Sequence, residues 1–191
     1  MVVILKMKIL RTIISTFFAT LLALTTVGQT ESLNVRPSHK NTIYFELFGN
    51  AIGYSFNYDR ILISKQKLKT AGRIGISYIP PILPPEHFII FPLEISELIS
   101  LGKENHNIEI GLGVTFLFQL HEGNDSGWWT NSEIDRRIET IAAPRLGYRY
   151  QRKDGGIFWK AGYTPLFGIS KTREDFIVPY MFGFSIGKTF N

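Results

Sequence analysis

The pattern of apolar and polar positions from Asn107 to Gln119 is the clearest structural signal in the chain. The sequence there reads NIEIGLGVTFLFQ. The even-numbered positions from Ile108 to Phe118 are large and apolar, whereas the odd-numbered positions are small or polar, with Leu117 as the exception. Because successive residues of a strand point to opposite faces, this pattern predicts one long strand with two unlike faces. A face that carries Glu109 and two glycines suits the inside of a narrow barrel, and the apolar face then meets lipid.

The same alternation divides the chain from residue 41 onward into eight strand-like segments. It predicts an all-β fold, an eight-stranded antiparallel up-and-down transmembrane β-barrel that occupies residues 42–191. The predicted strands are Thr42–Asn50, Ile52–Leu62, Ala71–Ile79, Phe88–Ser100, Asn107–Gln119, Ile138–Tyr150, Ile157–Phe167 and Tyr180–Phe190.

The connections between these segments fall into two classes that alternate along the chain. Those at one end are short, and those at the other end are long or rich in proline, except that the first one looks short at Gly49-Asn50. Short periplasmic turns and long external loops are typical of outer-membrane barrels. The short connections are 64–70, 102–106 and 151–155, and the others are 80–87, 120–137 and 168–179.

The N-terminal residues have the features of an export signal. Lys6, Lys8 and Arg11 precede the uncharged apolar run Thr12–Leu24, and small residues follow up to Gly28. This predicts a signal peptide over residues 1–28 and a linker over 29–41. Met7 is an alternative start, and a retained N-terminal anchor is the alternative to cleavage.

Charge and composition exclude several classes of function. The formal net charge is +5, but Lys6, Lys8 and Arg11 supply three of the 21 basic residues, so the rest carries 18 basic against 16 acidic residues. That excess is too small to predict nucleic-acid binding. Cysteine is absent, which removes disulfides, thiolate catalysis and cysteine-based zinc sites. The sequence predicts neither a cofactor nor a metal site.

Charged residues recur on the face that is predicted to point inward. An eight-stranded barrel is filled by side chains, and buried charges need partners. We therefore expect a paired ionic plug in the lumen, and a gated polar pathway for protons or small solutes is the alternative. The residues are Glu46, Arg73, Glu94, Glu109, Arg145, Arg149 and Lys160, with Asp59 near a rim.

The last segment, YMFGFSIGKTFN, alternates and carries the aromatic residue Phe190 at its end. With the other alternating strands, it resembles the small eight-stranded outer-membrane β-barrels of Gram-negative bacteria, the OmpA/OmpX-type and outer membrane protein beta-barrel domain families. The resemblance covers roughly residues 41–191. It implies a location in the outer membrane, membrane lipid as a partner, and Phe190 as part of the signal read by the barrel-assembly machinery. Phe190 is penultimate here, which departs slightly from the family pattern.

Two alternatives from other classes remain open. A lipid acyl hydrolase or transferase would need a nucleophile and a base at the rim, and His87 or His121 with Ser126 or Ser132 form a set without a spacing signature. A soluble lipocalin-like binding barrel would place the apolar face inside, with glycines and single ionic residues outside. The alternation with small inward residues favours the membrane barrel.

The sequence thus predicts a non-enzymatic integral outer-membrane barrel with a filled lumen. Its role is structural, or it binds an external ligand or surface through its loops. Trp128 and Trp129 are candidate contact residues in the loop 120–137, although they can equally fold onto the rim or enter the outer leaflet. A narrow pore and a lipid-modifying barrel are the other hypotheses.

Overall fold

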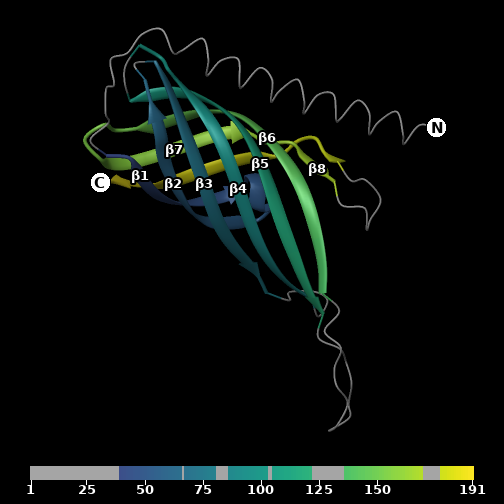
Figure 1. Ribbon diagram of the computed structural model, residues 1–191. Coiled ribbons are helices and arrows are strands. Elements are labelled where there is room, and N and C mark those ends of the chain that lie inside the picture. The colour runs from purple at the N-terminus through teal and green to yellow at the C-terminus, as the bar shows by residue number, and fades with distance from the viewer. Residues whose placement is uncertain (1–38, 66, 81–85, 103–104, 122–135, 170–176) are drawn as a thin grey trace, which may run out of the picture. The chain divides into compact units, whose positions relative to one another are not determined.

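The computed structural model describes residues 39–65, 67–80, 86–102, 105–121, 136–169 and 177–191. The predicted signal peptide and nearly all of the linker lie outside them. The strands are β1 Asn41–Phe48, β2 Tyr54–Ser64, β3 Leu68–Ile79, β4 Glu86–Ser100, β5 His106–His121, β6 Arg136–Gln151, β7 Gly156–Tyr163, β8 Leu166–Gly168, β9 Ile177–Val178 and β10 Phe182–Phe190 (Figure 1). Within these ranges, no helix has the length and apolarity needed to cross a bilayer.

The sheet closes on itself into a barrel. Strands β1 to β6 each pair antiparallel with the next, β7 pairs with β10, and β10 pairs with β1 from Asn41–Phe190 to Phe48–Gly183. The predicted closed, eight-stranded antiparallel fold is confirmed. Asn41, where β1 begins, lies opposite Phe190, where β10 ends. Both residues lie at the end of the barrel that carries the short turns.

The seventh and eighth predicted segments are each interrupted. The seventh separates into β7 and β8 at Thr164-Pro165, and β8 pairs with β6 instead of with β10. Proline has no N–H to donate to a ladder, so a continuous strand through Pro165 is disfavoured. The eighth begins at Phe182 rather than at Tyr180, and the short β9 pairs with β8.

The connection between β1 and β2 folds into the barrel. The prediction of a strand up to Asn50 was wrong, because β1 ends at Phe48 and Gly49–Ala51 form a buried 3-10 turn, η2. Phe48 and Ile52 flank the turn with φ values of 58° and 68°, a region that is uncommon for residues with large side chains. The hydroxyl of Thr115 on β5 donates to the Asn50 carbonyl at 3.0 Å and holds the turn inside.

Two apolar clusters surround this turn and close the end of the barrel opposite Asn41 and Phe190. One contains Ala51, Ile90 and Leu117, and the other contains Ile141, Ala143 and Leu166. Ile52 packs against both. Leu117, the one exception in the alternation of its strand, is therefore an inward-facing residue of this apolar layer, which lies above the polar interior.

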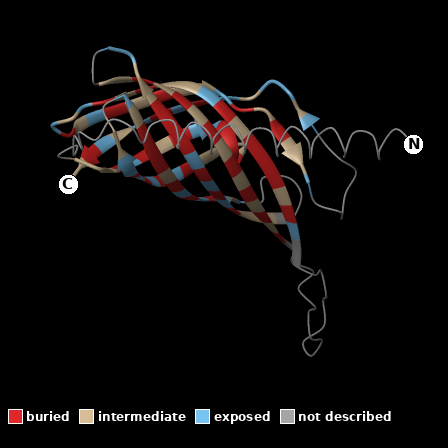
Figure 2. Ribbon diagram, turned by 45° about the horizontal axis from the view of Figure 1, so that its top comes forward, coloured by how far each residue is buried: buried red, intermediate tan, exposed pale blue. Residues whose placement is uncertain are grey.

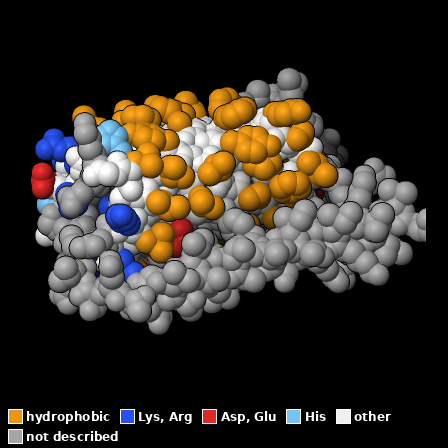
Figure 3. Space-filling model, turned by 90° about the horizontal axis from the view of Figure 1, so that it is seen from above, with side chains coloured by type: hydrophobic (Ala, Val, Ile, Leu, Met, Phe, Trp, Pro, Cys, Tyr) orange, Lys and Arg blue, Asp and Glu red, His pale blue; other side chains and the backbone are white. Residues whose placement is uncertain are grey.

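Elsewhere the strands alternate between buried and exposed residues, as the bands in Figure 2 show. The exposed positions are largely apolar: Phe56 is 61% exposed, Phe182 64% and Ile186 58%. Figure 3 shows such side chains over one face of the barrel, with most of the visible charged side chains at one end. The barrel is thus apolar outside and polar inside, below the apolar layer.

The seam between β1 and β10 depends on a close approach of the two backbones. Gly187 lies opposite Tyr44. A Cβ atom at Gly187 would overlap the Ile43 carbonyl and the Tyr44 backbone, whereas a Cβ at Gly53 would only reach ordinary contact with Ile79 at 3.8 Å.

We expect Gly187→Ala to lower the free energy of unfolding by about 1–3 kcal/mol, because overpacked sites must shift their neighbours. Gly53→Ala is the control and should leave it within about 0.5 kcal/mol. Urea titration of the folded protein in detergent measures both changes. Equal stability of the two variants would contradict a tight seam.

Candidate functional site

The candidate site is the ionic interior of the barrel. The seven ionic residues predicted from the sequence and Asp59 are all buried, with 6% exposure or less. They come from seven neighbouring strands, and the adjacent β10 contributes Ser185. Four are acidic and four are basic. In strand order they are Glu46 of β1, Asp59 of β2, Arg73 of β3, Glu94 of β4, Glu109 of β5, Arg145 and Arg149 of β6, and Lys160 of β7.

Glu46 lies between two guanidinium groups. Arg145 Nη2 is 2.7 Å from Glu46 Oε1, and Arg73 Nη2 pairs with Glu46 Oε2. The Ser185 hydroxyl also donates to Glu46 Oε1 at 3.2 Å. Glu46 of β1 therefore binds side chains of β3, β6 and β10, of which only β10 is its neighbour in the sheet. Its bonds to the two arginines are charge-assisted and so are stronger than neutral hydrogen bonds.

Glu94 receives the other ends of the same two arginines. Its Oε2 is 3.1 Å from Arg145 Nε and 3.3 Å from Arg73 Nη1. The Asn50 side chain of η2 donates to the same oxygen at 2.7 Å and accepts from Arg145 Nη2 at 3.1 Å. The inward-folded turn is therefore bound directly to the ionic cluster beneath it.

Arg149 and Asp59 form a second cluster, nearer the barrel end at which β1 begins and β10 ends. The pair is bidentate, with Arg149 Nη2 to Asp59 Oδ1 at 2.6 Å and Arg149 Nη1 to Asp59 Oδ2 at 3.0 Å. Because β6 and β2 are four strands apart in either direction around the ring, this pair spans the lumen. Gln151 accepts from Arg149 Nε at 3.0 Å and donates to the Thr42 hydroxyl at 3.3 Å.

Glu109 and Lys160 connect the two clusters. Lys160 Nζ lies 3.1 Å from Glu109 Oε1 and 3.6 Å from Glu94 Oε1. Glu109 Oε1 also lies 3.8 Å from Arg149 Nη1. The eight charges thus form one continuous network. Each of the four carboxylates contacts at least one arginine or lysine, so none of them is an unpaired carboxylate.

The amide side chains of Asn50, Asn57 and Gln151 complete the network. They were not predicted from the sequence as members of it. Asn57 accepts from Arg73 Nε at 2.9 Å, and Asn50 and Gln151 bind as described above. Asn57 and Gln151 share the inward alternation of their strands, so a search for all polar residues on that face would have found them. Asn50 lies in a turn, where the alternation gives no information.

The other residues singled out from the sequence are only partly described. Phe190 ends β10 opposite Asn41 and is half-buried. Trp128 and Trp129 lie outside the described residues.

The hypothetical catalytic set is not assembled in the described residues. His87 Nδ1 hydrogen-bonds the hydroxyl of Tyr78 at 2.7 Å. His121 is the last residue of β5, and Ser126 and Ser132 lie outside the described residues. Across the described part of the chain, no group of three or more His, Asp or Glu side chains is placed to hold a metal ion.

Removal of one partner of the Arg149–Asp59 pair should lower the free energy of unfolding more than removal of both partners. We expect Arg149→Met to destabilise the barrel by about 3–5 kcal/mol, because it leaves a buried carboxylate with less compensation. The double variant Arg149→Met/Asp59→Leu should recover a large part of this loss. The measurement is a double-mutant cycle of unfolding free energies.

The exposed pair Arg152–Asp154, at 4.0 Å, provides the matched control. Arg152→Met should change stability by less than about 1 kcal/mol, because surface ion pairs contribute little. Strictly additive losses at Arg149 and Asp59 would show that the two groups do not depend on each other.

Comparison with known proteins concerns the fold alone. No protein-family model matches the sequence, and the curated proteins contain no significant match to it. The structure is similar to the crystal structure of the N-terminal β-barrel domain of Pseudomonas aeruginosa OprF, with a TM-score of 0.50 and 16% sequence identity. The match covers 80% of this chain and 100% of that one. The resemblance to OmpA-type barrels therefore holds at the level of the fold.

Proposed function

We propose that this protein is an integral outer-membrane β-barrel with a side-chain-filled lumen, and that its external loops carry a structural or surface-binding role. The observation that carries the proposal is the distribution of polarity. Large apolar side chains such as Phe56, Phe182 and Ile186 are more than half exposed on the outside, while eight charged groups are paired inside. Lipid is the solvent that suits this outer surface.

The soluble lipocalin-like alternative requires the opposite arrangement. Such a barrel would bury its apolar face around a ligand and expose polar residues to water. Here Ile43, Ile74 and Phe184 point outward and are about half exposed, and Glu46 and Lys160 are completely buried. The polarity of the barrel therefore favours the membrane protein.

Aromatic residues at the end with the short turns agree with an interfacial belt. Trp159 packs against Tyr148 and Tyr150, with ring centroids 5.1 and 6.1 Å apart. His106 extends this group through contacts with both tyrosines. Aromatic side chains with polar tips are enriched where the hydrocarbon meets the headgroups. We infer that this end, at which β1 begins and β10 ends, faces the periplasm.

The filled lumen argues against a narrow pore. A water path would have to cross the ionic network and then the apolar layer around Ile52, in which Ile90 and Leu166 are fully buried. The longest connection, 122–135, leaves from the end where this layer lies. We therefore propose that function resides in the external loops, including Trp128 and Trp129, and in the mechanical role of the barrel.

Membrane fractionation tests the proposal. The expressed protein should remain with outer membranes after washing with high salt and should need detergent for release. Its folded and heat-unfolded forms should migrate differently on a gel. Recovery as a soluble monomer without detergent would favour the lipocalin-like alternative instead.

A charge introduced on the lipid-facing wall should lower the free energy of unfolding strongly at the middle of a strand and only slightly near the end of a strand. Leu93 is 39% exposed at the middle of β4, and Ile157 is 65% exposed at the start of β7. We expect Leu93→Arg to lower stability in liposomes by about 2–4 kcal/mol and Ile157→Arg by about 0–1 kcal/mol. Unfolding by urea measures both values. Equal tolerance of the two substitutions would indicate that water, not lipid, surrounds the wall.

A further inference from the structure

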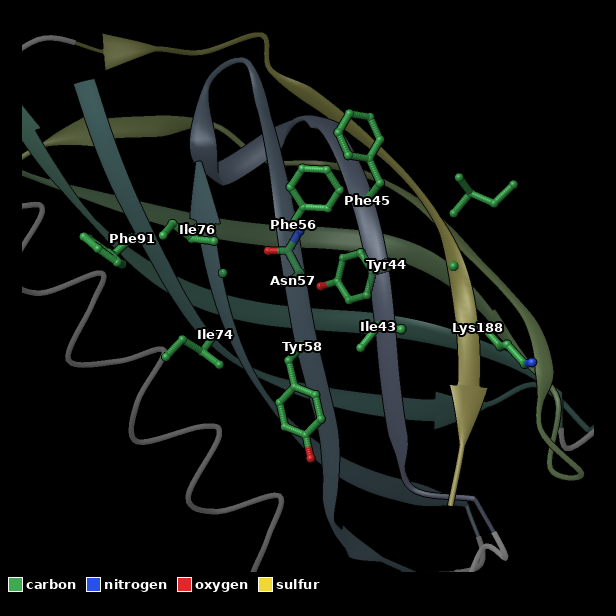
Figure 4. Close-up of a pocket in the computed structure, with 13 residues that line it drawn as sticks. Ile43, Tyr44, Phe45, Phe56, Asn57, Tyr58, Ile74, Ile76, Phe91 and Lys188 are labelled. Carbon is green, nitrogen blue, oxygen red and sulfur yellow. The ribbon is translucent and has the colours of Figure 1, made fainter. Parts of the chain in front are cut away.

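A groove crosses the outer wall of the barrel, with a volume of about 670 Å³ (Figure 4). It extends from β10 over β1 and β2 to β3, and Phe91 of β4 lies at its edge. Outward-facing apolar side chains, including Ile43, Phe45, Phe56 and Ile74, line it. Gly75 and Gly187 contribute backbone only. The groove is thus an apolar depression in a surface that otherwise has projecting side chains.

The edge of this groove that lies nearer the start of β1 is basic. Lys188 lines the groove, and it belongs to a lateral row in which Lys188 lies beside Ile43 and Ile43 beside Tyr58. In the next row toward the start of β1, Arg60 lies beside Asn41. Lys188 and Arg60 are both exposed. No carboxylate of the described residues forms an ion pair with either.

Lys188 lines the groove, and Arg60 lies just beyond its lining residues. They stand on either side of β1, about two interstrand spacings or 10 Å apart, and are offset along the strands by roughly two residues or 7 Å. Side chains of this length can converge on a phosphate between them. The Tyr58 hydroxyl donates to the Asn41 side chain at 2.7 Å, so a polar group also lies between the two basic side chains.

We propose that this groove binds one anionic phospholipid of the periplasmic leaflet, with an acyl chain along the apolar groove and the phosphate between Lys188 and Arg60. The inference rests on the proposed function, since the leaflet follows from the orientation of the barrel. The basic edge lies toward the barrel end at which β1 begins and β10 ends. A phosphate of lipid A, in the outer leaflet, would meet the opposite end. A second copy of the chain is disfavoured, because a symmetric contact through this groove would bring like charges together.

Native mass spectrometry of the full chain, refolded in detergent, tests the proposal. The probes are dioleoylphosphatidylglycerol and dioleoylphosphatidylcholine, added separately at equal concentration. We expect one tightly bound phosphatidylglycerol per monomer and weaker binding of phosphatidylcholine. Lys188→Gln and Arg60→Gln should each weaken phosphatidylglycerol binding about five-fold, and together about 25-fold, because each basic residue near an anionic lipid surface contributes about that factor.

Two control variants separate this site from general effects. Arg152→Gln removes a charge from the turn between β6 and β7 and should leave lipid binding unchanged. Phe56→Ala should weaken binding of the acyl chain, whereas Leu146→Ala, on the opposite strand β6 and 57% exposed, should not. Equal binding of the two lipids by the wild type, unchanged phosphatidylglycerol binding by the double variant, or a dimer in place of a lipid adduct would each overturn the proposal.

Insertion is measured separately, as heat-modifiable migration after folding into phosphatidylcholine vesicles. A wild-type chain that does not insert would contradict the proposed function itself. A chain that inserts but does not discriminate between the two phospholipids would overturn only the inference about the groove.

Discussion

The pairing of charges across the lumen is the interaction on which the rest of the structure depends. The lumen of an eight-stranded barrel has no room for bulk water, so each inward charge needs a counter-charge within reach. Arg149 and Asp59 achieve this across the full width of the ring, and Glu46 and Glu94 share the same two arginines. Apart from Arg73–Glu94, which are cross-strand neighbours on β3 and β4, these bonds join strands that do not pair in the sheet. They hold the interior of the barrel together, as the backbone ladder holds its wall.

The strand alternation predicted the barrel and the inward side of its charges, because a period of two relates sequence directly to face. It placed Glu109 and Arg145 on the inside without any knowledge of their neighbours. It could not predict which charges pair, because partners such as Arg149 and Asp59 are 90 residues apart and meet only once the ring closes. The register of the closing strands, which decides the pairs, is not contained in any single segment.

The turn η2 and the break at Pro165 were beyond prediction for a different reason. A Gly-Asn connection is compatible with a turn that points outward or inward, and the inward choice depends on a Thr115 hydroxyl and a Glu94 carboxylate from distant strands. Pro165 forbids one ladder bond but does not dictate that the chain should move to β6. Leu117 was the one visible sign of the apolar layer, since it broke an otherwise regular alternation.

Apolar residues fill part of the interior, in the layer around Ile52, so the need to fill the lumen does not by itself account for the ionic network. Buried ion pairs often contribute little net stability compared with apolar replacements. They do, however, penalise a wrong register. A slip of one residue in β5 would turn Glu109 toward lipid, at a cost on the order of several kcal/mol. Leu117, which the same slip would also turn outward, is apolar and would meet lipid without that cost. The charges therefore help to specify which face points inward, and the apolar layer can remain apolar because the ionic network below it fixes the register.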